Sequence, residues 1–486
     1  GGVCYVARVV PEDAQAAILK KGILTVEAVN VGKWGNKIQI SFNSVAKRKM
    51  QIVGANGDAY IAKSVDGFRE GDVVVVGNEY NRIKSIFDNS VMFDKPFETD
   101  VVDPAIVPST VLYLAEMEII VRYGNEQEKY AGMTLNMASP NYISYRMAKS
   151  EIVKIEVKSN DTIQNPVEAI LGSGITSGML TMDGGKDGSI AKVTAGTFIG
   201  EDMGPGKRTG IASFVENDVV SIIAVPGVTI PEVIVALVGH CENLKSRMAV
   251  LDMPKDATKV NELLEYREMI DSTYAAMYHP WIQVFDRSAN KADFIPPSGA
   301  VMGIYARTDA NRGVHKAPAN ETVFCSGLKT EYTKAEQDVL NPAGVNLLRL
   351  IPGQGIRIWG ARTASSNSSF RYVNVRRLFI YVEESIKAST NWVVFEPNDV
   401  TLWQRVSLTV GSFLDSMWRS GMLAGNTASE AYFVEIGPAT MSQDDIISGR
   451  LICNIGIAPS RPAEFVVFRV SQFTAEAGEE TGVAEE

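Results

Sequence analysis

The chain is poor in the residues that usually build metal centres and disulfide frameworks. Its 486 residues include only three histidines and four cysteines, which are scattered at Cys4, Cys241, Cys325 and Cys453. No two of these cysteines form a CxxC pair, so the sequence supports neither a zinc site nor a disulfide network. Reduced thiols in a protein made in the cytosol are the simplest interpretation.

Long uninterrupted apolar runs are also missing. The longest apolar stretch covers residues 219–239, but Pro226, Gly227 and Pro231 interrupt it and Glu232 lies inside it. This pattern favours a strand, a turn and a buried helix over a helix that spans a bilayer. The net charge of −10 argues against broad binding to nucleic acid, which requires a basic surface. We therefore expect neither membrane insertion nor a nucleic-acid partner.

The sequence contains no complete motif for nucleotide binding or hydrolysis. Neither Gly185-Lys186 nor Gly206-Lys207 has the spaced glycine before it and the Ser or Thr after it that a phosphate-binding loop requires. The motifs GxSxG and HExxH are absent, and His240, His279 and His315 lie far apart in the sequence. We therefore expect no cofactor and interpret the histidines as structural residues.

Two aspartates provide one alternative of a different class. Asp252 and Asp286 each end a strand that we predict to be parallel, and ligands of open α/β sheets gather at the carboxyl ends of such strands. Two carboxylates there could hold a metal in an enzyme with a flavodoxin-like domain. Because no third ligand accompanies them, capping of the following loops is the simpler interpretation.

The pattern of strand-like and helix-like segments changes along the chain and predicts a multidomain α/β and α+β fold. Residues 1–42 are expected to form the first part of a core, and residues 43–160 an inserted all-β domain, either a sandwich or a barrel. Residues 161–325 alternate strands and helices, which predicts an α/β core with a parallel sheet. Residues 326–473 predict an α+β domain that ends in a strand, and residues 474–486 a flexible acidic tail.

Individual elements follow from hydrophobic periodicity and from capping residues. The expected strands are residues 3–10, 38–42, 219–225, 248–252, 281–285 and 464–473, with strand-rich segments at 346–358 and 373–382. The expected helices are residues 14–19, a helix capped by Thr229, a stripe from 260 to 277, and a helix between the Asn398-Asp399 cap and Gly421.

Four ordered segments resemble those of contractile tail sheath proteins. Residues 353–363 are similar to the WGART strand of that family, and residues 370–378 to the paired-arginine segment that follows it. Residues 394–403 resemble its FEPN and LW stretch, and residues 458–465 its PAEF signature. Weaker similarity occurs at residues 1–8, 32–36 and 182–188. Because the segment similar to residues 1–8 lies well inside family members, we expect a further N-terminal portion to precede this chain.

The resemblance implies a structural machine without catalytic activity. Sheath subunits of this family stack as six-fold rings around a rigid inner tube, and contraction drives the tube through a target envelope by repacking rigid subunits. The implied partners are other copies of the chain, an inner tube protein, and baseplate and terminal cap proteins. The implied location is a virion tail or phage-tail-like particle assembled in the bacterial cytoplasm. Phages, bacteriocins and extracellular injection systems fit equally.

The resemblance also implies two assembly surfaces. Terminal arms in the family pair with a neighbouring subunit's sheet, which assigns the C-terminal arm to Glu464, Phe465, Val467, Phe468, Val470 and Phe473. A helix near the C-terminal end faces the tube, and the segment at 442–450 is our candidate by position, with Asp444, Asp445 and Arg450 as contacts. The alternative is a solvated helix start whose acidic residues are favoured by the helix dipole.

Overall fold

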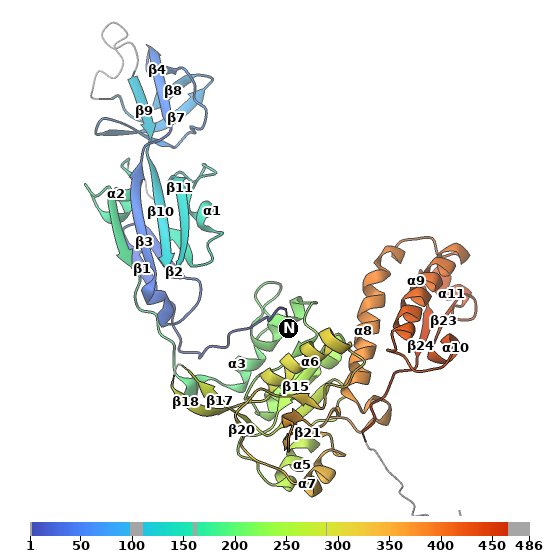
Figure 1. The fold of residues 1–486 in the computed structure, drawn as a ribbon. Helices are drawn as coiled ribbons and strands as arrows, with labels where there is room; N and C mark the ends of the chain where they lie inside the picture. Colours follow the sequence, from blue (N-terminus) through green and yellow to red (C-terminus); the bar gives the residue numbers. More distant parts are fainter. Residues whose placement is uncertain (1, 98–109, 159–162, 288, 465–486) are drawn as a thin grey trace, which may run out of the picture. The chain divides into compact units, whose positions relative to one another are not determined.

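The computed structural model describes residues 2–97, 110–158, 163–287 and 289–464 (Figure 1). The chain divides into two compact units. Val9–Thr197 form the first, which we call the N-terminal unit, and Gly1–Arg8 with Phe198–Glu486 form the second, which we call the main unit. No helix in the described part of either unit is long and apolar enough to cross a membrane.

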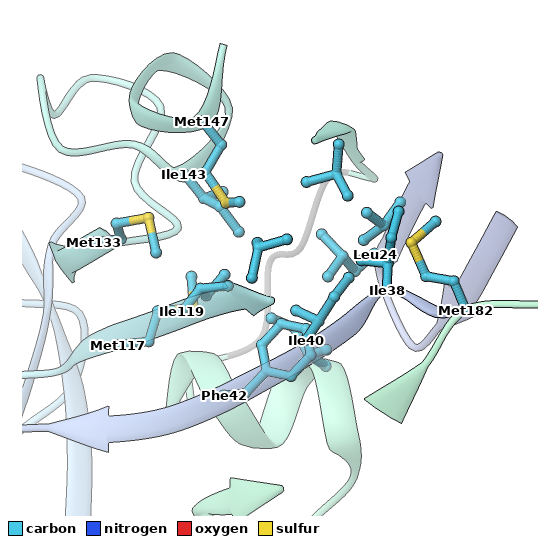
Figure 2. Close-up of a cluster of buried hydrophobic side chains, with 14 of the residues drawn as sticks. Leu24, Ile38, Ile40, Phe42, Met117, Ile119, Met133, Ile143, Met147 and Met182 are labelled. Atoms are coloured by element: carbon cyan, nitrogen blue, oxygen red, sulfur yellow. The ribbon is translucent and has the colours of Figure 1, made fainter. Parts of the chain in front are cut away.

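The N-terminal unit contains two antiparallel sheets whose inner faces share one core. One sheet has the order β1 (Ile18–Lys21), β2 (Leu24–Ala28) and β12 (Val153–Val157); the other has the order β11 (Glu126–Met133), β10 (Glu116–Tyr123), β3 (Gln39–Val45) and β13 (Ser177–Thr181). Alternate residues such as Ile40, Phe42 and Ile119 point into this core, because successive side chains of a strand face opposite sides. Figure 2 shows that Ile143 and Met147 of α1 (Ile143–Met147) join them.

A closed β-barrel lies between β3 and β10 in the sequence. Its strands are β4 (Lys49–Asn56), β5 (Ala59–Ala62), β6 (Val73–Val76), β7 (Glu79–Phe87), β8 (Ser90–Phe93) and β9 (Thr110–Leu114), in the order β4-β5-β8-β7-β6-β9. Closure comes from β4, which pairs with both β5 and β9, so the barrel has no open edge. The chain leaves and re-enters the sheet at Val45 and Glu116, which face each other in the β3–β10 pairing.

The borders of this unit differ from the predicted domain borders at 42/43 and 160/161. Strand β3 crosses the first border and pairs with both β10 and β13, so the segment 43–160 supplies strands to a sheet that also contains residues on either side of it. The predicted helix at 14–19 is wrong, because Ile18–Lys21 form β1 and pair with β2. Residues 3–10 form no strand, and Val3 and Val6 are exposed to solvent.

The main unit is built on a six-stranded mixed sheet. Its order is β14 (Ile222–Ile223), β15 (Met248–Asp252), β16 (Ala275–His279), β21 (Val345–Ile351), β22 (Gly355–Ile358) and β19 (Glu321–Thr322). The first four strands are parallel, and β22 and β19 complete the sheet in antiparallel pairings. The sequence predicted a parallel sheet here and placed two of its strands correctly, at 219–225 and 248–252. Helices α4 (Pro231–Leu244), α5 (Val260–Glu268), α6 (Ser298–Arg312) and α7 (Lys334–Leu340) contact its strands.

Two element predictions in this sheet need correction. The helix expected over 260–277 ends at Glu268, and Met277 belongs to β16, the third parallel strand. Every residue of β16 is buried. A strand buried on both faces is apolar throughout and lacks the two-residue alternation of a half-buried strand, so its apolar residues were read as a continuation of the helix. The strand expected at 281–285 is β17 (Ile282–Asp286), which lies in a separate antiparallel sheet with β18 (Lys291–Ile295) and β20 (Gly327–Leu328).

The last part of the main unit packs two long helices with a small sheet (Figure 1). Helix α9 (Val400–Arg419) begins where the sequence predicted, because Asp399 Oδ1 accepts a hydrogen bond from Leu402 N at 2.8 Å. The segment 373–382 was predicted as strand but lies in α8 (Val373–Ser389), whose inner face joins the core formed by α9, β23 (Tyr432–Ile436) and β24 (Cys453–Ile457). Tertiary packing therefore overrides the strand preference of its valines.

Candidate functional site

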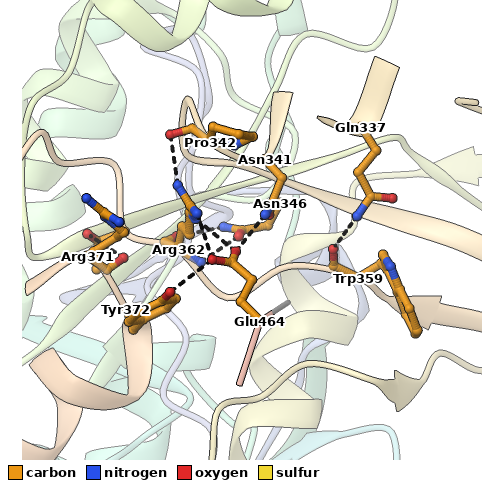
Figure 3. A network of polar contacts seen from close by, with 10 residues as sticks. Gln337, Asn341, Pro342, Asn346, Trp359, Arg362, Arg371, Tyr372 and Glu464 are labelled. Atoms are coloured by element: carbon orange, nitrogen blue, oxygen red, sulfur yellow. Dashed lines mark hydrogen bonds and ion pairs between the residues drawn. The ribbon is translucent and has the colours of Figure 1, made fainter. Parts of the chain in front are cut away.

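Glu464, the last residue that the structure describes, lies in a dense polar network (Figure 3). Its Oε1 accepts hydrogen bonds from Arg362 Nε at 2.9 Å and from Asn341 Nδ2 at 2.6 Å. Its Oε2 accepts from Arg362 Nη2 at 2.6 Å and from the Tyr372 hydroxyl at 2.9 Å. We call these four residues the Glu464 network. The bidentate contact with Arg362 is the strongest type of side-chain ion pair in proteins.

Strand β21 positions the arginine of this network. Asn346 of β21 is fully buried; its Oδ1 accepts from Arg362 N at 2.7 Å and its Nδ2 donates to Arg362 O at 2.8 Å. Arg362 Nη1 also donates to Pro342 O at 3.1 Å. A Cβ atom at Gly360 would lie 2.9 Å from the Oδ1 atoms of both Asn341 and Asn346, so this close approach requires glycine. The guanidinium is therefore fixed through both its backbone and its side chain.

The network keeps its carboxylate ionised. Burial by itself raises the pKa of Glu464, but the hydrogen bonds from Arg362, Asn341 and Tyr372 outweigh it and hold that pKa below its ordinary value. Burial, and then the hydrogen bond to Glu464, raise the pKa of the Tyr372 hydroxyl, which stays protonated and donates. Removal of one member of such a pair leaves a poorly solvated charge without its partner, which is strongly destabilising.

The network joins segments that the sequence singled out separately. Arg362 belongs to the WGART segment, Tyr372 to the segment at 370–378, and Glu464 to the PAEF segment. Sequence reasoning assigned Glu464 to the arm but missed Arg362, Tyr372 and Asn341 as its partners. One signal was available, because Arg362 is a lone charge between Ile358 and Ala364. The other predicted arm residues lie outside the described part of the chain: Phe465, Val467, Phe468, Val470 and Phe473.

A second candidate surface is the small sheet of β23 and β24. The strands pair antiparallel from Tyr432↔Ile457 to Ile436↔Cys453, and within the described residues this sheet contains no third strand. It packs on α9, while the ring of Phe433 lies over Gly456, where a Cβ atom would come within 2.1 Å of the ring. A two-stranded sheet is marginal by itself, and its edges offer backbone donors and acceptors to a further strand.

The predicted tube-facing residues lie around a short helix, α11 (Gln443–Ile447). Ser442 caps it, since its Oγ accepts from Asp445 N at 3.2 Å while Asp445 Oδ2 accepts from Ser442 N at 3.0 Å. The Ser442 hydroxyl also donates to Asp445 Oδ2 at 2.7 Å, and this hydrogen bond and the one from Ser442 N lower the pKa of Asp445. Arg450 Nη2 lies 3.1 Å from its Oδ1. Asp444 is exposed. Asp445 and Arg450 are thus partners of each other in the isolated chain, and all three residues are close enough together to form one surface.

The structure does not bring Asp252 and Asp286 to one sheet edge. Asp252 at the end of β15 accepts from Gly227 N at 2.9 Å and from Ser298 N and Oγ at 2.8 and 2.6 Å. Burial raises its pKa, and its contacts tie β15 to the start of α6. Asp286 lies opposite Lys291 in the separate β17–β18 pairing. The described residues contain no group of three or more His, Cys, Asp or Glu placed to hold a metal. The enzyme alternative therefore loses its geometric basis.

Comparisons with known proteins agree on one family. Residues 202–364 match the phage tail sheath protein central domain, and residues 365–473 the phage tail sheath C-terminal domain. A major tail sheath protein of a Pseudomonas aeruginosa (strain UCBPP-PA14) prophage is 26% identical over 293 residues, which cover 57% of this chain and 72% of that protein. The tail sheath protein of Escherichia phage P2 is 23% identical over 309 residues, which cover 61% and 76%.

Solved structures give the same picture. The sheath complex of an extracellular contractile injection system, PVC, in its contracted state is 35% identical, with a TM-score of 0.50 over 55% of this chain and 75% of that one. The sheath tail protein of Listeria innocua is only 11% identical but matches 92% of this chain and 82% of its own, also with a TM-score of 0.50. The second match is one of fold alone.

Proposed function

The chain belongs to the phage tail sheath protein family, and from this membership we propose that its copies stack as six-fold rings around an inner tube and contract to drive that tube through a target envelope. It is a structural subunit of a contractile phage tail or injection particle. Its proposed partners are other copies, an inner tube protein, and baseplate and terminal cap proteins. Assembly in the bacterial cytoplasm is part of the same proposal, and no catalytic step is included.

The Glu464 network is the observation that carries the proposal. Subunits that slide past one another while they stay connected need a tether whose root does not pull out of its own subunit. Four hydrogen bonds, two of them from one guanidinium, hold the side-chain carboxylate of Glu464 at the start of the proposed arm. Force on the arm is then transmitted through Arg362 to the buried strand β21. The proposed arm comprises Glu464, Phe465, Val467, Phe468, Val470 and Phe473.

The β23–β24 sheet is the proposed acceptor for the arm of a neighbouring subunit. Its two strands are packed on one face by α9, and addition of a strand to its edge supplies main-chain hydrogen bonds without requiring a matched side-chain surface. A tether of this type tolerates rotation of the subunits, because a strand added to a sheet edge is held by main-chain hydrogen bonds and does not depend on a matched side-chain surface.

The inner and outer surfaces of the particle are assigned by charge and by topology. Asp444, Asp445 and Arg450 are proposed to face the tube, since exposed ion pairs contribute only about 0–1 kcal/mol each and allow the tube to be released. The barrel of the N-terminal unit is proposed to lie on the outside, because the chain makes it as an excursion between β3 and β10. Beyond these two connections, polar contacts such as those from Asn136 Nδ2 to Glu70 O at 2.9 Å and to Asp72 Oδ1 at 2.7 Å join it to the rest of the unit.

Negative-stain microscopy tests the proposed function. The chain, produced together with a tube protein from the same particle, should form long hollow cylinders with six-fold symmetry in averaged cross-sections. The chain produced without the tube protein is the control for tube-dependent assembly. Failure of the co-produced proteins to associate into any elongated particle would contradict the proposal, as would cylinders with another rotational symmetry.

A further inference from the structure

The loop between α8 and α9 displays an aromatic side chain that contacts no other part of the described chain. Phe395 has a relative exposure of 102%, and its backbone lies in the left-handed region with φ of +69°. A residue with a bulky side chain rarely adopts this conformation, which persists only where the surrounding structure imposes it. Val394 before it is 63% exposed and Val400 after it 58% exposed, so the loop forms an apolar knob.

The ends of this loop are held firmly. On one side the guanidinium of Arg405 lies 4.3 Å from the centre of the Trp392 ring. On the other side Asn398 Oδ1 accepts from Trp403 Nε1 at 2.7 Å, and Asn398 Nδ2 donates to Arg450 O at 3.0 Å. The strained presentation of Phe395 is therefore imposed by a rigid frame and is not a consequence of a loose loop.

The same unit contains a groove of suitable character. It has a volume of about 590 Å³ and lies beside α8, between residues 218–221 and the end of α6. Its apolar lining comes from Val219, Ile380, Tyr381, Ala388 and Met422, and Val219 and Tyr381 are 75% and 44% exposed.

Two of the charged residues that line this groove, Arg377 and Asp309, are paired with each other, and Asp218 and Glu384 line it as well. The side chain of Arg377 is only 7% exposed, and its Nη1 donates to Asp309 Oδ1 at 2.9 Å. The apolar part of the lining suits a neutral aromatic ring, which needs no countercharge.

We propose that Phe395 of one copy inserts into this groove of the next copy in the particle. The inference rests on the proposed polymerisation. A knob and a groove on different parts of one chain make a head-to-tail contact, which either closes into a ring or repeats along a helix, and both arrangements occur in stacked rings. A second copy fits this apolar contact better than the inner tube does, since the tube must be released during contraction, and a buried aromatic anchor resists release.

Replacement of the knob is the first test. Phe395→Ser should leave a folded monomer and reduce the number of long cylinders on microscopy grids at least tenfold, an effect of the size that a lost aromatic anchor produces. Phe87→Ser is the matched control, because Phe87 is 80% exposed at the end of β7 and should be dispensable. Cylinders of normal length and number from the Phe395→Ser chain would overturn the inference.

The groove provides the complementary test. Ala388→Trp fills one end of the groove and should reduce cylinders as Phe395→Ser does, while the monomer keeps its thermal unfolding midpoint. A photoreactive benzoylphenylalanine at position 395 should crosslink to residues 218–221, 377–388 or 422 of another copy, identified by mixing isotopically light and heavy chains. Crosslinks to the inner tube protein, or to a different surface of the chain, would contradict the proposal. If the wild-type chain forms no cylinders, the proposed function fails instead.

Discussion

At the scale of single residues, the Glu464 carboxylate has no spare capacity, because its two oxygens accept four hydrogen bonds. Glu464→Gln keeps the shape but leaves the buried guanidinium of Arg362 without its counter-charge. We expect the free energy of unfolding of the main unit to fall by about 2–3 kcal/mol. Urea denaturation monitored by tryptophan fluorescence measures this loss. Glu396→Gln, at an exposed position, is the control and should change stability little.

Comparison of the wild-type chain with Glu464→Gln also gives a prediction about pH. The folded-state pKa of Glu464 lies below its ordinary value of 4.5, so its ionised form stabilises the fold above that value. This contribution is lost as pH falls through the folded-state pKa. The difference in stability between wild type and Glu464→Gln should therefore be constant between about pH 7 and pH 5.5 and close below pH 4.5. A difference that grows as the solution becomes more acidic would show that the network does not act through its charge.

Substitution of Phe395 is expected to raise the free energy of unfolding, whereas Glu464→Gln lowers it. Because its φ is +69°, a residue that tolerates the left-handed region should relieve strain, and its side chain loses no buried contact. Phe395→Asn should raise the free energy of unfolding by about 0.5–1 kcal/mol. Phe87→Asn, at an exposed strand position with ordinary backbone, should give no gain. Differential scanning calorimetry distinguishes these outcomes, and a lower midpoint for Phe395→Asn would mean that the loop is not strained.

At the scale of elements, local signals predicted α9 because three of them agreed. A capping aspartate, an apolar stripe and a left-handed Gly421 all marked the same helix. Asp399→Ala removes the cap, and we expect a loss of about 1 kcal/mol. Asp444→Ala in α11, whose capping bonds involve Ser442 and Asp445, is the control and should be nearly neutral. Thermal unfolding of both chains tests this, and equal losses would contradict the role of the cap.

Other elements could not be predicted because their determinants are distant in sequence. Segment 373–382 and strand β16 are both apolar and rich in residues that suit either structure, so their partners decide between helix and strand. The Glu464 network likewise joins residues that are distant in the sequence. Arg362 and Glu464 are 102 positions apart, and Asn341 and Glu464 are 123 apart. Pairing of β21 with β22 places Arg362 near Asn341, and no periodicity of the sequence carries this information.

At the scale of the whole molecule, we expect that a variant can lose the ability to assemble while it still folds. Deletion of residues 470–486 removes the end of the proposed arm and the acidic tail but leaves the Glu464 network intact. We expect a folded monomer with an unchanged thermal midpoint that forms no long cylinders, since the tether to the neighbour is lost. Deletion of residues 480–486, which removes only the end of the acidic tail, is the control and should assemble. Normal cylinders from the longer deletion would rule out the arm.

The barrel should be removable as a unit. Residues 46–115 can be replaced by Asn-Gly, because Val45 and Glu116 are directly opposite in the β3–β10 pairing and a two-residue turn joins such positions. Glu116→Thr in the same chain avoids leaving a carboxylate without Arg48, whose Nε lies 3.0 Å from it. Circular dichroism and thermal unfolding should show a folded chain. Aggregation of this variant would mean that the barrel supports the two sheets beside it.

The pairing of Val45 with Glu116 also has a consequence for how such proteins diverge. Whatever the chain does between these two residues, it must return to the same pair of adjacent backbone positions. Mutations within the barrel therefore escape the constraints that fix the contractile machinery, and the barrel can drift, lengthen or be exchanged for an unrelated domain in one recombination event. If the barrel lies on the outside of the particle, as proposed, lineages under pressure from a changing host or environment can alter that surface while the contractile mechanism is inherited intact.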